Sequence, residues 1–316
     1  MLNNQVALII VFNHNYEKNL KKLHLLYGKR FKNIYYLIPF YQGDEENVIP
    51  VYGSSYYFQG FISQSLKIIY KKHYDHYIYI ADDLILNPDI NENNYKELFK
   101  IGDESSFIPE YFSLDSVSSK KILDLKEVRG FDSIDNQTKF YWGHTNRALN
   151  FSLQREGLES ETLLPTYEEA ISRMTNHGIK IAPLKHEDIL GICPEVHEKE
   201  ARYCLEYPLV ASYSDIVIVS AQAIKEFSFY CGVFFAQNLF VELAIPTSLL
   251  MSTKKIITEK MLQKSGKVFW LYNPVEAEGY QNLVSKYEWK LEQLMNKWPN
   301  DYLYVHPLKL SKWEHQ

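Results

Sequence analysis

Residues 75–90 read DHYIYIADDLILNPDI, a β-prone run that stops at two adjacent carboxylates, Asp82 and Asp83. Strand interiors reject aspartate, so this pair marks the carboxyl end of a strand. Carboxylates in such a place can bind a hard divalent cation, and the cation can bind phosphate groups. The alternative is a pair of solvated turn residues ahead of Pro88. The sequence upstream favours the first interpretation.

Alternating strand-like and helix-like segments precede the two acids. The apolar run 6–12 is typical of a strand buried on both faces, and residues 34–40 predict a second strand. Residues 16–27 carry apolar side chains at helical spacing until Gly28. Residues 58–69 have the same spacing, after serines suited to cap a helix. This alternation predicts a parallel sheet.

Ligands of parallel α/β sheets bind beyond the carboxyl ends of the strands. His14 follows the first predicted strand, the polar loop 43–46 follows the second, and Asp82 and Asp83 follow the third. We therefore expect these residues to lie along one edge of the sheet.

The first hundred residues resemble the nucleotide-binding half of a glycosyltransferase of the GT-A fold, in which an Asp-x-Asp motif follows a βαβαβ unit. Ala81, Asp82 and Asp83 resemble shortened forms of that motif, and Leu84 stands where the strict motif has its second acid. Either aspartate could therefore bind the metal ion, and position favours Asp83. Segments 58–61, 82–88 and 240–247 are also similar to segments of small glycosyltransferase-like proteins.

The resemblance implies an α/β fold of GT-A-like (Rossmann-like) type, with a mixed, mostly parallel sheet flanked by helices. It divides the chain into a nucleotide-sugar-binding half, 1–100, an inserted acceptor-side region, 101–206, and the rest of the catalytic domain, 207–316. It also implies a Mn²⁺ or Mg²⁺ cofactor. The implied nucleotide-sugar-binding residues are Phe12, His14, Asp82, Asp83 and Arg147, the metal ligands are Asp83 and His306, and the catalytic residues are Glu242 and Lys309.

Glu242 is the candidate general base. The stretch 227–251 is apolar, and Asn238 and Glu242 are four residues apart within it, on one face of an expected helix. A carboxylate in apolar surroundings has a raised pKa, which suits a base. Pro246 cannot donate to the carbonyl of Glu242, so we expect a kink there. The alternative is a glutamate held by backbone or arginine contacts.

The carboxyl-terminal third predicts three further strands and a helix. Residues 216–219, introduced by Asp215, and residues 268–272 are strand-like, and residues 280–294 have helical spacing. A last strand begins at Tyr302 and ends in a polar cluster: His306, Lys309 and Ser311. By resemblance, His306 would bind the metal ion and Lys309 would neutralise the leaving diphosphate. The alternative for His306 is a hydrogen bond to the backbone.

The middle of the chain is harder to interpret. Residues 163–178 predict a helix and 179–185 a short strand. Residues 140–147, which include Arg147, could form a binding loop or an ordinary capped helix start. Residues 186–206 are rich in acids, histidine and cysteine, but no spacing matches a closed zinc site, so a loop or acceptor-side lid is favoured.

Composition agrees with a globular enzyme. The chain has 316 residues and a net charge of −5, which argues against a nucleic-acid partner. Basic clusters at 18–30 and 67–72 fit solvated helix faces, or attachment to anionic lipid at the inner face of a membrane. Tyrosine is abundant, at 25 residues. Aromatic rings do bind sugars, but we expect most of these side chains to belong to the core.

Cysteine usage and hydropathy predict a location in the cytoplasm. The three cysteines, Cys193, Cys204 and Cys231, form no disulfide framework or paired metal motif, so a reducing compartment is expected. The apolar run near the amino terminus is too short for a membrane anchor and is expected to be a strand.

These features together predict a metal-dependent glycosyltransferase acting in surface polysaccharide synthesis, such as that of lipopolysaccharide. The expected partners are a nucleotide sugar and a glycan or lipid-linked glycan acceptor. A nucleotidyltransferase would usually carry a glycine-rich loop after the first strand, where this chain has 13–15. The other alternative is a catalytically inactive nucleotide-binding module.

Overall fold

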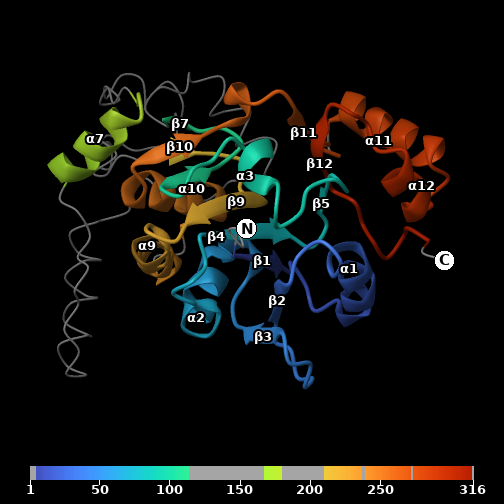
Figure 1. The fold of residues 1–316 in the computed structure, drawn as a ribbon, viewed down its shortest axis with the longest axis horizontal. Coiled ribbons are helices and arrows are strands. Elements are labelled where there is room, and N and C mark those ends of the chain that lie inside the picture. Colours follow the sequence, from blue (N-terminus) through green and yellow to red (C-terminus); the bar gives the residue numbers. More distant parts are fainter. Residues whose placement is uncertain (1–4, 114–166, 180–209, 237–238, 272, 315–316) are drawn as a thin grey trace, which may run out of the picture.

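The computed structural model describes residues 5–113, 167–179, 210–236, 239–271 and 273–314. Its central feature is a seven-stranded sheet in the order β10-β6-β9-β4-β1-β2-β3, flanked by helices (Figure 1). All strand pairs in this sheet are parallel except those of β9 with β4 and β6. The fold is therefore α/β with a mixed, mostly parallel sheet, compatible with a Rossmann-like architecture, as the sequence predicted.

The central strands come from the apolar runs identified in the sequence. The strands of the main sheet are β1 (Val6–Val11), β2 (Asn33–Pro39), β3 (Val48–Val51), β4 (His76–Ala81), β6 (Ser105–Phe107), β9 (Ile216–Ser220) and β10 (Lys255–Ile257). Every residue of β1, β4 and β9 is buried, as expected for strands covered on both faces. The strand β6 belongs to this sheet although it lies in the range 101–206, which was predicted to be an inserted region.

The strand β3 was not predicted. It contains Pro50, which has no N–H to donate. A central strand forms hydrogen bonds along both of its edges, so proline is normally confined to the edge strands of a sheet. The structure accommodates Pro50 because β3 is the last strand of the sheet and pairs only with β2 there.

Helices cover the two faces of the sheet as two layers. On one face, Ala7, Ile9 and Val11 of β1 pack in a core with α2 (Gln59–Ile69), α9 (Ile224–Ala236) and α10 (Val241–Ser252). On the other face, Leu8 and Ile10 share a core with α1 (Leu20–Tyr27), α3 (Tyr95–Leu98), α11 (Pro274–Lys286) and α12 (Leu291–Asn296). Figure 1 shows α1, α11 and α12 on one side of the sheet and α2 and α9 on the other.

A small second sheet brings the end of the chain to the first half. It has the order β11-β12-β5, formed by β11 (Ser265–Val268), β12 (Tyr302–His306) and β5 (Ile85–Leu86). The predicted strand 268–272 is thus wrong in position, since β11 ends at Val268. The predicted helix over 280–294 is also wrong as one element, because Glu288 and Trp289 adopt φ values of 50° and 57° between α11 and α12.

The apolar stretch 227–251 forms two helices rather than one. The helix α9 ends at Ala236 and α10 begins at Val241. Glu242 therefore lies in the first turn of α10. Asn238, predicted to share a helix face with it, lies outside the described residues. Pro246 is inside α10.

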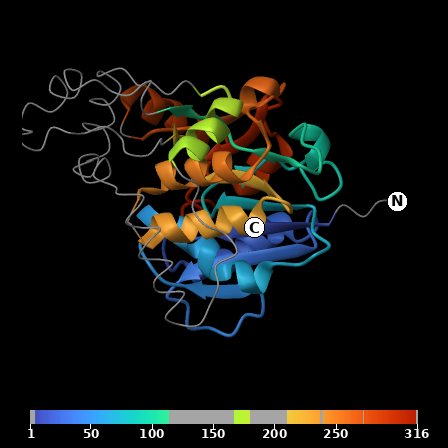
Figure 2. The same ribbon diagram turned by 90° about the vertical axis from the view of Figure 1, so that its left-hand side faces the viewer.

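Other predictions concern the middle of the chain. The helix α7 (Tyr167–Asn176) confirms the helical prediction there, and it lies over α10 in Figure 2. Two short strands flank α7 in the sequence, β7 (Phe112–Ser113) before it and β8 (Val210–Ala211) after it. They pair with each other in antiparallel fashion. The predicted strand 179–185, loop 140–147 and acidic segment 186–206 fall outside the described residues, apart from Ile179. Within the described part of the chain, no helix has the length and apolar character needed to cross a membrane.

Candidate metal and nucleotide site

Asp82 and Asp83 directly follow β4, where this strand ends beside β1. The N–H of Asp82 donates to the carbonyl of Val11 over 2.9 Å. The N–H of Asn13 donates in return to Asp82 Oδ1 over 3.2 Å. These contacts fix Asp82 against the end of β1, at the sheet edge where α/β proteins bind ligands.

The antiparallel strand β9 adds a third acid at the same edge. Ile80 of β4 is paired with Ile216, so β9 begins where β4 ends. Asp215 immediately precedes β9, and its carbonyl accepts a hydrogen bond from the N–H of Ala81 over 2.9 Å. In the sequence, Asp215 is recognisable only as the residue before a predicted strand. Its place in the site depends on the direction of β9, which no local sequence pattern reveals.

The register of the small sheet brings His306 to the acids. Val305 pairs with Ile85 and Tyr304 with Leu86 in antiparallel fashion, so the chain after β12 runs alongside Asp83. The N–H of Leu308 donates to the carbonyl of Asp83 over 2.6 Å. As a result, His306 Nε2 lies 3.2 Å from Asp83 Oδ1 and 3.9 Å from Asp215 Oδ2.

Burial and mutual charge set the protonation of this cluster. Burial, and then the neighbouring charge of Asp83, raises the pKa of Asp82 to about 7. Burial would also raise the pKa of Asp83, but the imidazolium of His306 and, more weakly, Lys309 hold it below its usual value. The pKa of His306 is raised because Asp215 and Asp83 outweigh the effect of burial. The favoured state pairs an ionised Asp83 with a protonated His306.

The Asp83–His306 pair fits two adjacent ligands of a divalent ion. Ligands about 2.1 Å from an octahedral ion and at right angles are about 3.0 Å apart, close to the 3.2 Å found here. Asp83 Oδ1 and His306 Nδ1 are buried and have no hydrogen-bond partner of good geometry among the described residues. Those residues contain no group of three His, Cys, Asp or Glu side chains placed to hold a metal ion.

The remaining predicted residues are distributed around this centre. Phe12 is fully buried, and its ring packs edge-on against Tyr36 at 6.3 Å, so it supports the end of β1 from inside. His14 is exposed just beyond. Lys309 is also exposed and close enough to Asp83 to lower its pKa. Arg147 lies outside the described residues. The binding roles assigned to these residues remain predictions.

Two further residues support the acids and were not identified from the sequence. The Asn19 side chain donates to Asp82, which opposes the rise of its pKa. The buried ring of Tyr213 lies 5.5 Å from the ring of His306 and stacks on Tyr304 at 6.2 Å. Tyr213 therefore forms one wall beside His306. The surrounding sequence gives no signal for either role, since both contacts join distant segments.

Two members of the basic cluster at 18–30 have structural partners. Lys22 Nζ donates to the carbonyls of Leu310 and Trp313 over 2.7 and 2.9 Å, which fixes the segment after His306. Arg30 donates through Nε to the carbonyl of Ile90 over 2.8 Å, in the segment after β5. Both side chains thus hold segments next to the acids in place.

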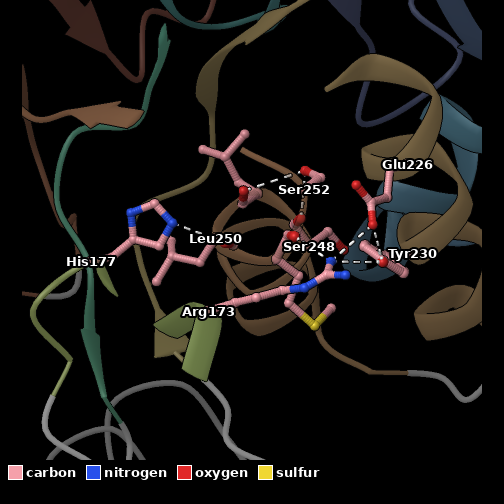
Figure 3. A network of polar contacts seen from close by, with 9 residues as sticks. Arg173, His177, Glu226, Tyr230, Ser248, Leu250 and Ser252 are labelled. Carbon is pink, nitrogen blue, oxygen red and sulfur yellow. Dashed lines mark hydrogen bonds and ion pairs between the residues drawn. The ribbon is translucent and has the colours of Figure 1, made fainter. Parts of the chain in front are cut away.

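A second polar cluster lies away from these acids, where α7 meets α9 and α10 (Figure 3). Arg173 Nη1 donates to Glu226 Oε1 at 2.9 Å, to the Tyr230 hydroxyl at 3.2 Å and to the carbonyl of Met251 at 2.7 Å. His177 Nε2 lies 3.0 Å from the carbonyl of Leu250. Both side chains meet carbonyls at the carboxyl end of α10, where the helix dipole favours a cation such as the Arg173 guanidinium. The cluster attaches α7 to the fold.

Comparisons with known proteins give no family assignment. No family model matches the chain, and no curated protein has significant sequence similarity to it.

Proposed function

We propose that this protein is a metal-dependent glycosyltransferase of the GT-A type. It would transfer a hexose or related sugar from a nucleotide-sugar donor to a glycan or lipid-linked glycan in surface polysaccharide synthesis. The observation that carries the proposal is the contact of Asp83 with His306 at the carboxyl end of β4. It joins the acid pair to a histidine from the far end of the chain, as the resemblance implies.

Five residues have a defined task in this proposal. Asp83 and His306 would hold Mn²⁺ or Mg²⁺, which when bound supplies positive charge to the diphosphate leaving group. Asp82, fixed by the N–H of Asn13, would keep Asp83 oriented and bind the donor. Lys309 would add positive charge beside the diphosphate. Glu242, in the first turn of α10, would take the proton from an acceptor hydroxyl if the reaction inverts configuration.

The mixed sheet also supports the proposal. Three neighbouring parallel strands, β1, β2 and β4, end together on the side of Asp82. A nucleotide lying across these ends would reach the acids with its phosphates. The N–H of Asn13 and the exposed ring of His14 follow β1 at this edge, next to Asp82.

Thermal unfolding with a panel of nucleotide sugars, with and without Mn²⁺, tests the proposal. We expect one donor to stabilise the protein only with metal, by about 2.7 kcal/mol at a hundredfold excess over Kd. Asp83→Asn and His306→Gln should each abolish this metal-dependent increment. Asp301→Asn, at an exposed position before β12 and at the opposite end of this strand from His306, is the matched control and should keep it.

Three outcomes would contradict the proposal. Metal-dependent stabilisation that survives Asp83→Asn would exclude Asp83 as a ligand of the metal ion. Pyrophosphate release from a nucleoside triphosphate and a sugar phosphate would identify a nucleotidyltransferase. Tight metal-dependent binding of a nucleoside diphosphate, with neither hydrolysis nor transfer of any sugar, would identify an inactive binding module.

A further inference from the structure

Exposed aromatic rings gather along the same edge of the sheet. Among the described residues, four aromatic side chains expose between 50% and 67% of their surface: Tyr16, Phe40, Tyr52 and Tyr56. All four follow the carboxyl ends of β1, β2 or β3. Every other tyrosine whose burial the structure describes is at least partly buried, as expected for core residues. An exposed cluster of this kind indicates an interaction site.

Three of these rings and Phe240 form two ring pairs, which we together call the aromatic shelf (Phe40, Tyr52, Tyr56 and Phe240). Pro39 is paired with Val51, so the residues that follow, Phe40 and Tyr52, lie side by side. Their ring centroids are 5.7 Å apart. The ring of Tyr56 lies 6.3 Å from that of Phe240, which directly precedes α10. One pair of the aromatic shelf thus lies at the end of β2, and the other includes the residue that precedes the helix carrying Glu242.

Phe40 adopts a backbone conformation that disfavours a large side chain. Its φ is 55°, in the left-handed region that glycine or asparagine normally occupies. Burial does not compensate, since 58% of the side chain is exposed. A strained residue that keeps an exposed aromatic ring at a strand end is typical of a ligand-binding position.

The charge around the aromatic shelf restricts the chemical class of ligand that can bind there. Asp44, Glu45 and Glu46 are exposed in the loop that follows Phe40. These carboxylates repel anionic lipids and phosphates, and they accept hydrogen bonds from hydroxyl groups. The face of an aromatic ring carries negative charge density and attracts polarised C–H groups. A neutral sugar ring offers both: an apolar face of C–H groups and a rim of hydroxyls.

We propose that the aromatic shelf is a binding site for neutral carbohydrate. This deepens the proposed function, in which the shelf holds sugar units of the glycan acceptor. Binding itself requires neither metal nor nucleotide. Absence of carbohydrate binding at the aromatic shelf would therefore not contradict the proposed Asp83–His306 site. Absence of metal-dependent donor binding would likewise not contradict carbohydrate binding at the aromatic shelf.

The variant Tyr52→Ala/Tyr56→Ala tests the shelf. Both side chains are exposed. The hydrogen bonds between Tyr52 and Gln64 use only the backbone N–H and carbonyl of Tyr52, each over 2.8 Å, so the substitution keeps them and we expect the fold to persist. The measurement is calorimetric titration, without metal or nucleotide, of neutral oligosaccharides of glucose, galactose or N-acetylglucosamine at millimolar concentration. We expect at least one to bind and the double variant to bind about tenfold more weakly. Ile68→Ala, which alters an exposed side chain at the other end of α2, should bind as wild type does.

The proposal is overturned if no oligosaccharide of the panel binds, or if the double variant binds as well as wild type. It is equally overturned if the double variant loses only adhesion to phosphatidylserine vesicles or only self-association in sedimentation velocity. Those results would identify a lipid surface or a second copy of the chain as the occupant.

Discussion

The N–H of Ser212 donates a hydrogen bond over 3.0 Å to the carbonyl oxygen of Glu242. In a regular helix this oxygen would accept from residue 246, but Pro246 has no N–H to give. Ser212 therefore satisfies the carbonyl that the proline leaves open. This contact attaches the first turn of α10 to the segment that leads into Asp215, and it fixes Glu242 relative to the acids at the sheet edge.

Replacement of Glu242 by glutamine should separate chemistry from donor binding. If Glu242 takes the acceptor proton, Glu242→Gln lowers kcat by about 10²–10⁴-fold. Metal-dependent binding of the donor should remain, since the metal ligands are unchanged. Transfer kinetics and thermal shift measure the two effects, with the exposed Glu278→Gln on α11 as control. Activity close to that of wild type would exclude Glu242 as the base.

Replacement of Asp82 by asparagine should stabilise the metal-free protein at neutral pH. Folding raises the Asp82 pKa from 3.8 to about 7, so the folded state binds more protons than the unfolded state between these values. Stability from this group is therefore lost as the pH rises through that window. The advantage of Asp82→Asn should grow from pH 4 to 7 and exceed about 1 kcal/mol at pH 8. Urea unfolding measures it, and an advantage independent of pH would contradict this cause.

The buried His76 should produce the opposite dependence on pH. Burial lowers its pKa from 6.5, and its ring nitrogens lie 3.0 Å from the Tyr95 hydroxyl and 3.1 Å from the carbonyl of Ser105. The unfolded state binds more protons just below pH 6.5, so stability falls as the solution is acidified. The difference in unfolding free energy between wild type and His76→Gln should shrink below pH 6.5, by at most about 1.4 kcal/mol per pH unit. If this difference in unfolding free energy did not change with pH, the loss of stability in acid would have to come from groups other than His76.

Arg173 should be needed to hold α7 against the rest of the fold. Arg173→Met keeps the apolar stem but removes the donors to Glu226, Tyr230 and Met251. We expect a loss of about 1–3 kcal/mol in unfolding free energy and faster proteolysis within α7. Lys260→Met, at an exposed position, should change neither quantity. Unchanged proteolysis in Arg173→Met would show that apolar packing alone holds the helix.

The central strands could be predicted from the sequence because buried parallel strands are continuous apolar runs. This rule identified β1, β2, β4 and β9. It missed β3, where Pro50 is tolerated only because the strand lies at the sheet edge. Local spacing also joined α11 to α12, because apolar side chains continue across the bend at Glu288 and Trp289.

The candidate site was predictable to the extent that its residues have a local signal. Asp82 and Asp83 stand at the end of a recognisable strand, and His306 ends another. Asp215 and Tyr213 enter the site only because β9 runs antiparallel to β4. The direction of a strand depends on the whole topology and is not encoded in five residues of sequence. The contact of Lys22 with Leu310 and Trp313 is long-range in the same way.

The pairing of β5 with β12 has a consequence for biosynthesis. Residues 6–81 are synthesised, and can pair their parallel strands, well before His306, whose imidazole meets Asp83. A nascent polypeptide therefore carries Asp83 without this imidazole until β12 has been synthesised. Proteolytic cleavage between α12 and β12 would likewise separate the imidazole from Asp83, and it would also remove β12 from the core that it shares with Leu8 and Ile10 of β1.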